Sequence, residues 1–252
     1  MGVRASYYHH FAQALQAQGI TAITADWRGQ GSSSLRASRE VDFGYEELVQ
    51  DLHELITEIR GTLQPSQSLI VVGHSLGGQI ASLCSARYPQ DLDGLVLLAA
   101  CLVHYKGWAG WQAQVIRLAG HLFYPLSRVV GYFPGKIIGF GGREARTVMY
   151  DWCYNLLYGS YRLAKSNFDY EAGLKRAQLP VLAISIKSDR YAPQQAVENL
   201  RQKFSSNTQR EHRHLDLGES PSHKNPHFYW VKGSAIILPE IVKWSIRIRK
   251  TR

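Results

Sequence analysis

One serine in this chain stands in a pattern that is typical of nucleophilic enzymes. The apolar residues 69–72 lead directly into residues 73–77, which read Gly-His-Ser-Leu-Gly, and helical spacing follows at once. This order predicts a sharp strand-to-helix turn that exposes the Ser75 hydroxyl on a strained backbone. A side chain at position 73 or 77 is expected to collide with its neighbours, so both positions should require glycine. The alternative is a glycine-rich turn that contains a serine by chance.

A serine hydroxyl is a weak nucleophile, so it needs a base and a carboxylate that orients the base. With this kind of turn the three residues follow in the chain order Ser, Asp or Glu, His. Asp189 comes just after the apolar residues 181–186 and is the expected acid. Its alternative role is to cap the helix that begins near Pro193. The base is expected in the loop before the last helix, where His223 and His227 both satisfy the order and spacing does not choose between them.

The negative oxygen that forms during acyl transfer needs two backbone N–H donors. One is expected from Leu76, at the positive end of the helix that follows the serine. The second normally comes from a loop after an earlier strand, which here falls on residues 1–3, beginning with Met1. His74 is expected to point away from the turn, in a structural or pocket-lining role. This chemistry requires no metal and no cofactor.

The flanking residues predict helices and strands in alternation. Before residue 101, helical spacing covers residues 7–18, 45–60 and 79–88, and apolar strand patterns cover 20–26, 68–74 and 92–100. After residue 178, strands are expected at 179–186 and 209–217, and helices at 194–204 and 235–250. Such alternation predicts an α/β fold with a mostly parallel sheet flanked by helices.

The alternation is interrupted between residues 101 and 178, where aromatic residues and glycines are dense. An insertion at this point, after the strand that follows the serine helix, is expected to form a helical cap over the site. The predicted division is therefore a core of residues 1–100 and 179–252 and a cap of residues 101–178. The aromatic residues favour a partly apolar pocket wall. They are Trp108, Trp111, Phe123, Tyr124, Tyr132, Phe133, Tyr150, Trp152, Tyr154, Tyr158 and Tyr161.

Composition narrows the possible locations and partners. The chain has 252 residues and is 45% hydrophobic, enough for one sizeable core. Its three cysteines lack Cys-x-x-Cys spacing, which favours packed free thiols over a zinc site or a disulfide framework. Residues 1–20 have no apolar signal region, and the longest apolar run, 95–103, is about half a membrane span. A cytoplasmic protein is expected, and the match of residues 1–6 to the N-myristoylation pattern is attributed to chance.

The net charge of +9 does not by itself predict a nucleic-acid partner. The positive residues are scattered, apart from a cluster at 247–252, and no nucleic-acid-binding module accompanies them. The cluster fits a solvated helix C-terminus, where cations interact favourably with the negative end of the helix dipole. The expected partner is a small acyl substrate, and the oligomeric state is left open.

Several stretches resemble α/β-hydrolases of the monoacylglycerol-lipase and serine-aminopeptidase-like type. Residues 26–33, Asp-Trp-Arg-Gly-Gln-Gly-Ser-Ser, are similar to their Asp-x-Arg-Gly-x-Gly-x-Ser turn, and residues 73–78 to their serine turn. Residues 131–136, 152–153 and 189–193 are more narrowly similar to a bacterial group of predicted α/β-hydrolases of unassigned substrate. In that group a Gly-His-Phe-Gly-Phe-Phe-Arg stretch carries the catalytic histidine, and residues 226–232 are the nearest match here.

That resemblance implies His227 as the base, with Pro226 and Tyr229 replacing glycines of the family pattern. The family's first strands, ahead of Gly2, are missing, so either the start codon lies further upstream or this copy is shortened. The function implied is a serine hydrolase acting on an ester, a thioester or an amide. One alternative is a weak or inactive scaffold that binds a small ligand or a partner. Another is the same turn used for acyl transfer or haloperoxidase-like chemistry.

Overall fold

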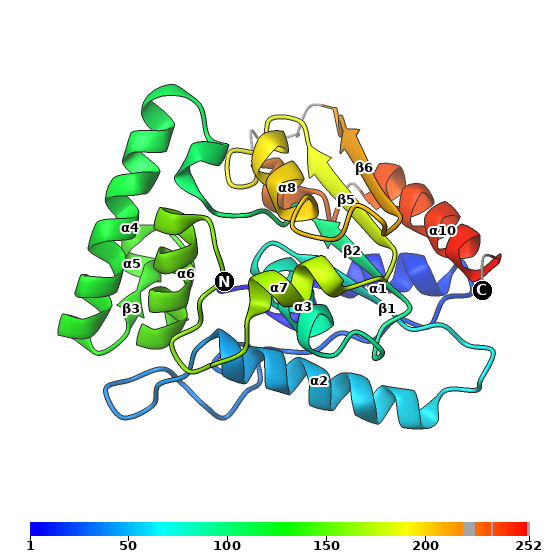
Figure 1. Ribbon diagram of the computed structural model, residues 1–252, viewed down its shortest axis with the longest axis horizontal. Helices are drawn as coiled ribbons and strands as arrows, with labels where there is room; N and C mark the ends of the chain where they lie inside the picture. Colours follow the sequence, from blue (N-terminus) through cyan, green and yellow to red (C-terminus); the bar gives the residue numbers. More distant parts are fainter. Residues whose placement is uncertain (219–224, 233, 251–252) are drawn as a thin grey trace.

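The computed structural model describes residues 1–218, 225–232 and 234–250. Its central sheet has four parallel strands in the order β1-β2-β5-β6 (Figure 1). The strands are β1 (Ile70–His74), β2 (Gly94–Leu98), β5 (Val181–Ile186) and β6 (Arg210–Leu215). Because parallel strands end at the same edge of a sheet, residues that follow β1, β5 and β6 meet there. The α/β fold predicted from the alternation is confirmed.

Helices cover both faces of this sheet (Figure 1). One face carries α1 (His9–Gln16) and α10 (Ser234–Lys250), which pack against each other. The other face carries α2 (Tyr45–Thr62), α3 (Leu76–Arg87), α7 (Tyr170–Arg176) and α8 (Gln194–Arg201). Strands β2 and β5 are buried along their whole length, as continuous apolar runs in a parallel sheet predict. The core therefore lies on the two central strands.

A group of helices lies at one end of the molecule, beyond the ends of the strands (Figure 1). It contains α4 (Gly110–Val130), α5 (Gly135–Ile138) and α6 (Arg146–Tyr158), with a short hairpin of β3 (Phe133–Pro134) and β4 (Arg143–Glu144). Two short 3-10 helices, η1 (Ala5–Tyr8) and η2 (Tyr105–Gly107), lie before α1 and α4. Helix α7 also falls in the predicted insertion 101–178, but it packs against α3 of the sheet layer.

The prediction of a strand over residues 20–26 is wrong. The segment has no regular secondary structure and belongs to no ladder, because no described strand lies between it and β1. A cavity of about 350 Å³ lies there instead, lined by residues 20–27 on one side and 68–74 on the other. Strand β1 is consequently an edge strand, and Ile70, Val71 and Val72 are only half-buried. Apolar spacing predicted a strand, but a strand also needs a neighbouring strand to accept and donate its hydrogen bonds.

Candidate active site

Ser75 occupies the turn between β1 and α3. Its φ of +52° and ψ of −123° give the strained conformation that the sequence predicts. A Cβ on Gly73 would lie 2.4 Å from the Cα of Gly78, so this position requires glycine. The expectation for Gly77 is wrong, since a Cβ there would meet only Trp27, at 3.9 Å. The second glycine that the turn requires is Gly78, where a Cβ would lie 2.3 Å from the Cβ of Ala100.

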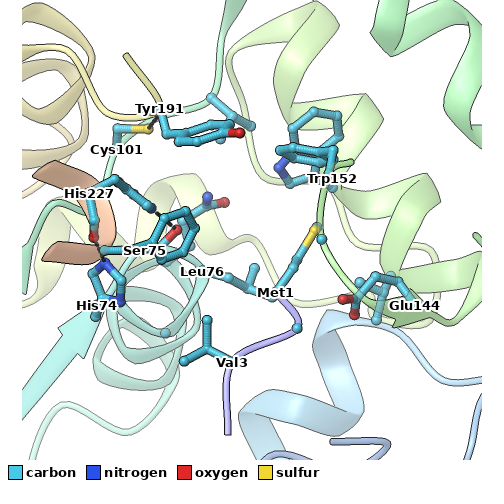
Figure 2. Close-up of a pocket in the computed structure, with 18 of the residues that line it drawn as sticks. Met1, Val3, His74, Ser75, Leu76, Cys101, Glu144, Trp152, Tyr191 and His227 are labelled. Atoms are coloured by element: carbon cyan, nitrogen blue, oxygen red, sulfur yellow. Dashed lines mark hydrogen bonds between the residues drawn. The ribbon is translucent and has the colours of Figure 1, made fainter. Parts of the chain in front are cut away.

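Three predicted residues form a chain of hydrogen bonds at the sheet edge. His227 Nδ1 lies 2.8 Å from Asp189 Oδ2. His227 Nε2 lies 3.0 Å from Ser75 Oγ, and Figure 2 shows these two residues side by side. The carboxylate oxygen can only accept, so Nδ1–H donates to it, and the neutral ring then accepts the Ser75 hydroxyl at Nε2. His227 and Asp189 are 3% and 4% exposed, so water is largely excluded from their contact. Ser75 is half-buried and lines the cavity described below.

Asp189 is fixed by the turn that follows β5. Its Oδ1 accepts the backbone N–H groups of Tyr191 at 2.8 Å and Ala192 at 3.1 Å. This leaves Oδ2 directed at the imidazole of His227. The N-cap of α8 is Pro193, so Asp189 does not cap that helix. Both carboxylate oxygens are thus occupied by donors, which favours a single orientation of the group.

His227 lies on α9 (Pro226–Tyr229), a single helical turn. Asn225 caps this turn by accepting the backbone N–H of His227 at 3.0 Å. Pro226 takes the first helical position, where its fixed φ is favourable and its missing N–H is not needed. The departure from the family pattern at position 226 is therefore compatible with a well-capped turn. His223 lies outside the described residues.

The sequence did not predict a second set of hydrogen bonds to α9, which links it to Tyr8 through His74. The Tyr8 hydroxyl lies 2.8 Å from His74 Nδ1, and His74 Nε2 lies 2.9 Å from the backbone oxygen of His227. His74 is buried and does point away from the serine hydroxyl, as expected, but it also ties β1 to α9 (Figure 2). Only the tertiary fold brings Tyr8 to this position, so no signal in the sequence indicated it.

Ser75 opens into a cavity of about 650 Å³. Four of the predicted aromatic wall residues line it, namely Trp108, Trp111, Phe123 and Trp152, together with Phe140, which the prediction omitted. The other predicted aromatics are absent from its lining; Phe133 and Tyr161, for example, are buried elsewhere, and Tyr158 is exposed to solvent. The cavity is large enough for a drug-sized or acyl ligand, and its surface is mainly apolar.

The first three residues line the same cavity. Figure 2 shows Met1 beside Leu76, with its side chain directed towards Trp152. Leu76 is the first residue of α3, where a backbone N–H has no acceptor within the helix. The N–H of Ala5 donates to Asp26 Oδ1 at 2.7 Å, so it is already engaged.

A second serine also contacts histidine, but in a closed environment. Ser185 Oγ on β5 lies 2.8 Å from His212 Nε2, and His212 Nδ1 lies 3.1 Å from Glu198. This cluster has the residue types of a catalytic triad. Ser185 is fully buried, however, so a substrate cannot reach its hydroxyl. All three cysteines are buried free thiols, as predicted, and burial raises the pKa of Cys84 and Cys153 to about 12.

Comparison with solved structures identifies the fold. A monoacylglycerol lipase from Paleococcus ferrophilus superposes with a TM-score of 0.60 at 15% identity, covering 98% of this chain and 91% of that one. A thermophilic esterase from Thermogutta terrifontis gives a TM-score of 0.62 at 15% identity, covering 98% and 87%. Together with the serine turn and the parallel sheet, these similarities define an α/β-hydrolase fold.

The sequence comparison gives the family. Residues 1–137 match the family model described as serine aminopeptidase, S33. A monoacylglycerol lipase of Mycolicibacterium smegmatis is 32% identical over 118 residues, which are 47% of this chain and 41% of that protein. The matched part of this chain thus spans about two fifths of that curated relative's length. The chain belongs to the serine aminopeptidase S33 family of α/β-hydrolases.

Proposed function

We propose that this protein is a serine hydrolase that cleaves a carboxylic ester, or a related thioester or amide, through an acyl-enzyme. The observation that carries the proposal is the chain of contacts from Ser75 Oγ to His227 Nε2 and from His227 Nδ1 to Asp189. These contacts lie on a strained turn that opens into a large apolar cavity. A buried base and acid, joined to a half-buried hydroxyl, form the arrangement that acyl transfer needs.

In the proposed mechanism the Ser75 oxygen attacks the carbonyl carbon of the substrate while His227 Nε2 removes its proton. His227 then protonates the leaving group as the carbon–oxygen bond breaks. A water molecule, activated by the same nitrogen, cleaves the acyl-enzyme and restores the hydroxyl. Asp189 keeps Nδ1 protonated and stabilises the charged imidazole in each transition state.

The oxyanion is proposed to bind two backbone N–H groups. Leu76 supplies one from the first turn of α3, where the helix dipole adds positive potential. The second is proposed to come from residues 1–3, and specifically from an N–H of the α-amino group of Met1, which lies beside Leu76 in the cavity wall (Figure 2). The engagement of Ala5 with Asp26 supports a donor earlier in the chain.

The substrate is proposed to carry an apolar acyl group. Side chains from α4, α5 and α6 form much of the cavity wall, which supports a cap role for segment 101–178. Apolar lining favours hydrocarbon over charged groups. Named relatives include a monoacylglycerol lipase and a methyl ester esterase that acts on pimeloyl-acyl carrier protein, and both names agree with ester cleavage.

A fluorophosphonate probe tests the proposal, because it phosphonylates only an activated serine and releases fluoride. Wild type should be labelled at Ser75, and Ser75→Ala should abolish both labelling and turnover of a p-nitrophenyl ester. His227→Ala should also lose labelling, while His223→Ala should keep it. Absence of labelling in a folded sample would overturn the hydrolase and favour a scaffold that binds a ligand. Loss with His223→Ala but not with His227→Ala would move the base to His223.

A further inference from the structure

The cap helix α4 has apolar side chains on a face that nothing covers in the described structure. Its inner face packs against α6, where Gly120 lies close to Leu156 and Leu157. The outer face carries an apolar row with helical spacing of three and four residues. This row, here called the outer stripe, consists of Trp111, Val115, Leu118, Leu122, Leu126 and Val129.

The outer stripe is far more exposed than apolar residues usually are. Trp111 and Val129, the first and last residues of the stripe, are each 73% exposed. Ile137, on the neighbouring α5, is 88% exposed. Monomeric proteins rarely leave a contiguous apolar surface of this extent in water, so a surface of this kind marks a binding site. The stripe does not indicate a membrane span, because no helix among the described residues is long and apolar enough to cross a bilayer.

Charge indicates what binds there. From residue 94 to residue 143 the chain contains five lysines and arginines and no aspartate or glutamate. Four of these cations are exposed on the cap and form no ion pair with any described residue; they are Lys106, Arg117, Arg128 and Lys136. An apolar helix face that carries tryptophan and leucine beside unpaired cations fits the boundary of an anionic lipid layer.

The outer stripe is continuous with the mouth of the cavity. Trp111, Val115 and Ile138 are exposed, and each also lines the cavity that contains Ser75. A hydrocarbon chain could therefore pass from a lipid layer into the cavity without crossing water. A second copy of the chain fits less well, because a symmetric contact would place the cap's unpaired cations near their own copies and cover the mouth.

We propose that the outer face of α4, with α5, docks on an anionic lipid surface and takes its apolar substrate from that surface. The inference deepens the proposed function, since it assigns the substrate to lipids. Docking itself does not require turnover, so it can be measured on Ser75→Ala, in which catalysis is removed. The two proposals can thus fail separately.

The direct test is flotation of the full-length Ser75→Ala chain with lipid vesicles. Binding is expected to vesicles of equimolar phosphatidylcholine and phosphatidylglycerol, to weaken with salt, and to be much lower on pure phosphatidylcholine. Adding Leu118→Ser and Leu122→Ser, which lie outside the cavity lining, should lower the partition coefficient by about tenfold or more. Adding Arg117→Gln and Arg128→Gln instead should reduce the preference for anionic vesicles.

Matched controls make the test specific. Ile236→Ser with Ile246→Ser removes two exposed isoleucines from α10. Lys175→Gln with Lys243→Gln removes two exposed lysines that lie on α7 and α10 and are not among the four cations named above. Neither pair should change binding. The proposal is overturned if the Ser75→Ala chain fails to bind anionic vesicles, or if a control pair weakens binding as much as the cap variants. A dimer that Leu118→Ser with Leu122→Ser dissociates, without vesicle binding, would assign the stripe to a second copy.

Turnover separates the two proposals. In the active protein, Leu118→Ser with Leu122→Ser should leave hydrolysis of a short water-soluble ester unchanged and lower hydrolysis of a long-chain ester embedded in anionic vesicles. An equal loss on both substrates would overturn docking as the role of the stripe. Vesicle binding without any fluorophosphonate labelling would instead overturn the proposed hydrolase function and leave the proposed docking on lipid standing.

Discussion

His74 donates its Nε2–H to the backbone carbonyl of His227 at 2.9 Å, although the two residues are 153 positions apart. Because a carbonyl oxygen only accepts, this contact sets the tautomer of His74 and leaves Nδ1 to accept the Tyr8 hydroxyl. Burial and the nearby His227 lower the pKa of His74 well below 6.5. An uncharged hydrogen bond therefore connects the serine turn to the turn that carries the proposed base.

Tyr8→Phe is expected to loosen this connection between the two turns. It removes the donor to His74 Nδ1 and leaves that nitrogen buried without a partner. We expect kcat for a soluble ester to fall about tenfold, the effect of roughly 1–2 kcal/mol, with little change in KM. Steady-state kinetics will check this, with Tyr158→Phe at an exposed position as the control. An increase in KM alone would show that Tyr8 acts on binding and not on positioning the base.

Asp189→Asn should fold but lose most of its activity. The amide oxygen can still accept the N–H groups of Tyr191 and Ala192, but the amide nitrogen then faces His227 Nδ1. Two donors cannot pair, so the imidazole turns to the tautomer that cannot accept the serine proton. By analogy with serine proteases, we expect kcat to fall by about 10⁴. Asp216→Asn, at an exposed carboxylate, is the control, and near-normal kcat in Asp189→Asn would remove Asp189 from the mechanism.

The glycines of the serine turn should differ sharply in their tolerance of alanine. Gly78→Ala places a methyl group 2.3 Å from the Cβ of Ala100 and 2.8 Å from the backbone oxygen of Gly73. We expect it to lower the free energy of unfolding by about 1–3 kcal/mol or more. Gly77→Ala meets only Trp27, at 3.9 Å, and should change stability by less than about 1 kcal/mol. Denaturant unfolding of both variants will decide, and equal losses would contradict the predicted packing.

Asp151 should make stability depend on pH. Burial raises its pKa from 3.8 to about 7, although its carboxylate accepts the N–H groups of Tyr45 and Ala164. Between these pKa values the folded state holds a proton that the unfolded state has lost. The free energy of unfolding should therefore fall as pH rises from about 4 to about 7, by at most about 4 kcal/mol.

Comparison with Asp151→Asn isolates this effect. His74 acts in the opposite direction: its pKa is depressed in the folded state, so its contribution is lost as pH falls below about 6.5. The total pH profile is therefore not informative by itself. The free energy of unfolding should be measured in urea at pH 5 and pH 7.5 for wild type and for Asp151→Asn. Relative to the variant, wild type should be less stable at pH 7.5 than it is at pH 5. An equal difference at both values would mean that Asp151 is ionised throughout.

The sequence was sufficient for the parts of this protein that depend on local pattern and chain order. Residues 68–78 predicted the strained serine turn because strand, glycines and helix are contiguous. The alternation of apolar runs predicted a parallel sheet, and chain order predicted that the acid and the base follow the serine in the segments after later strands. Ser75, Asp189 and His227 were named on this basis and on resemblance, and the structure brings them within hydrogen-bonding distance.

Only the tertiary structure decided what depends on contacts between distant segments. Residues 20–26 have the spacing of a strand, but a strand exists only where a neighbour accepts and donates its hydrogen bonds, and none is described there. A side chain at position 78 is excluded by Ala100, which follows β2, as well as by the serine turn itself. Tyr8 meets His74 because α1 packs beside the sheet. Contacts of this kind form between residues that the sequence separates, so they follow from packing and not from spacing.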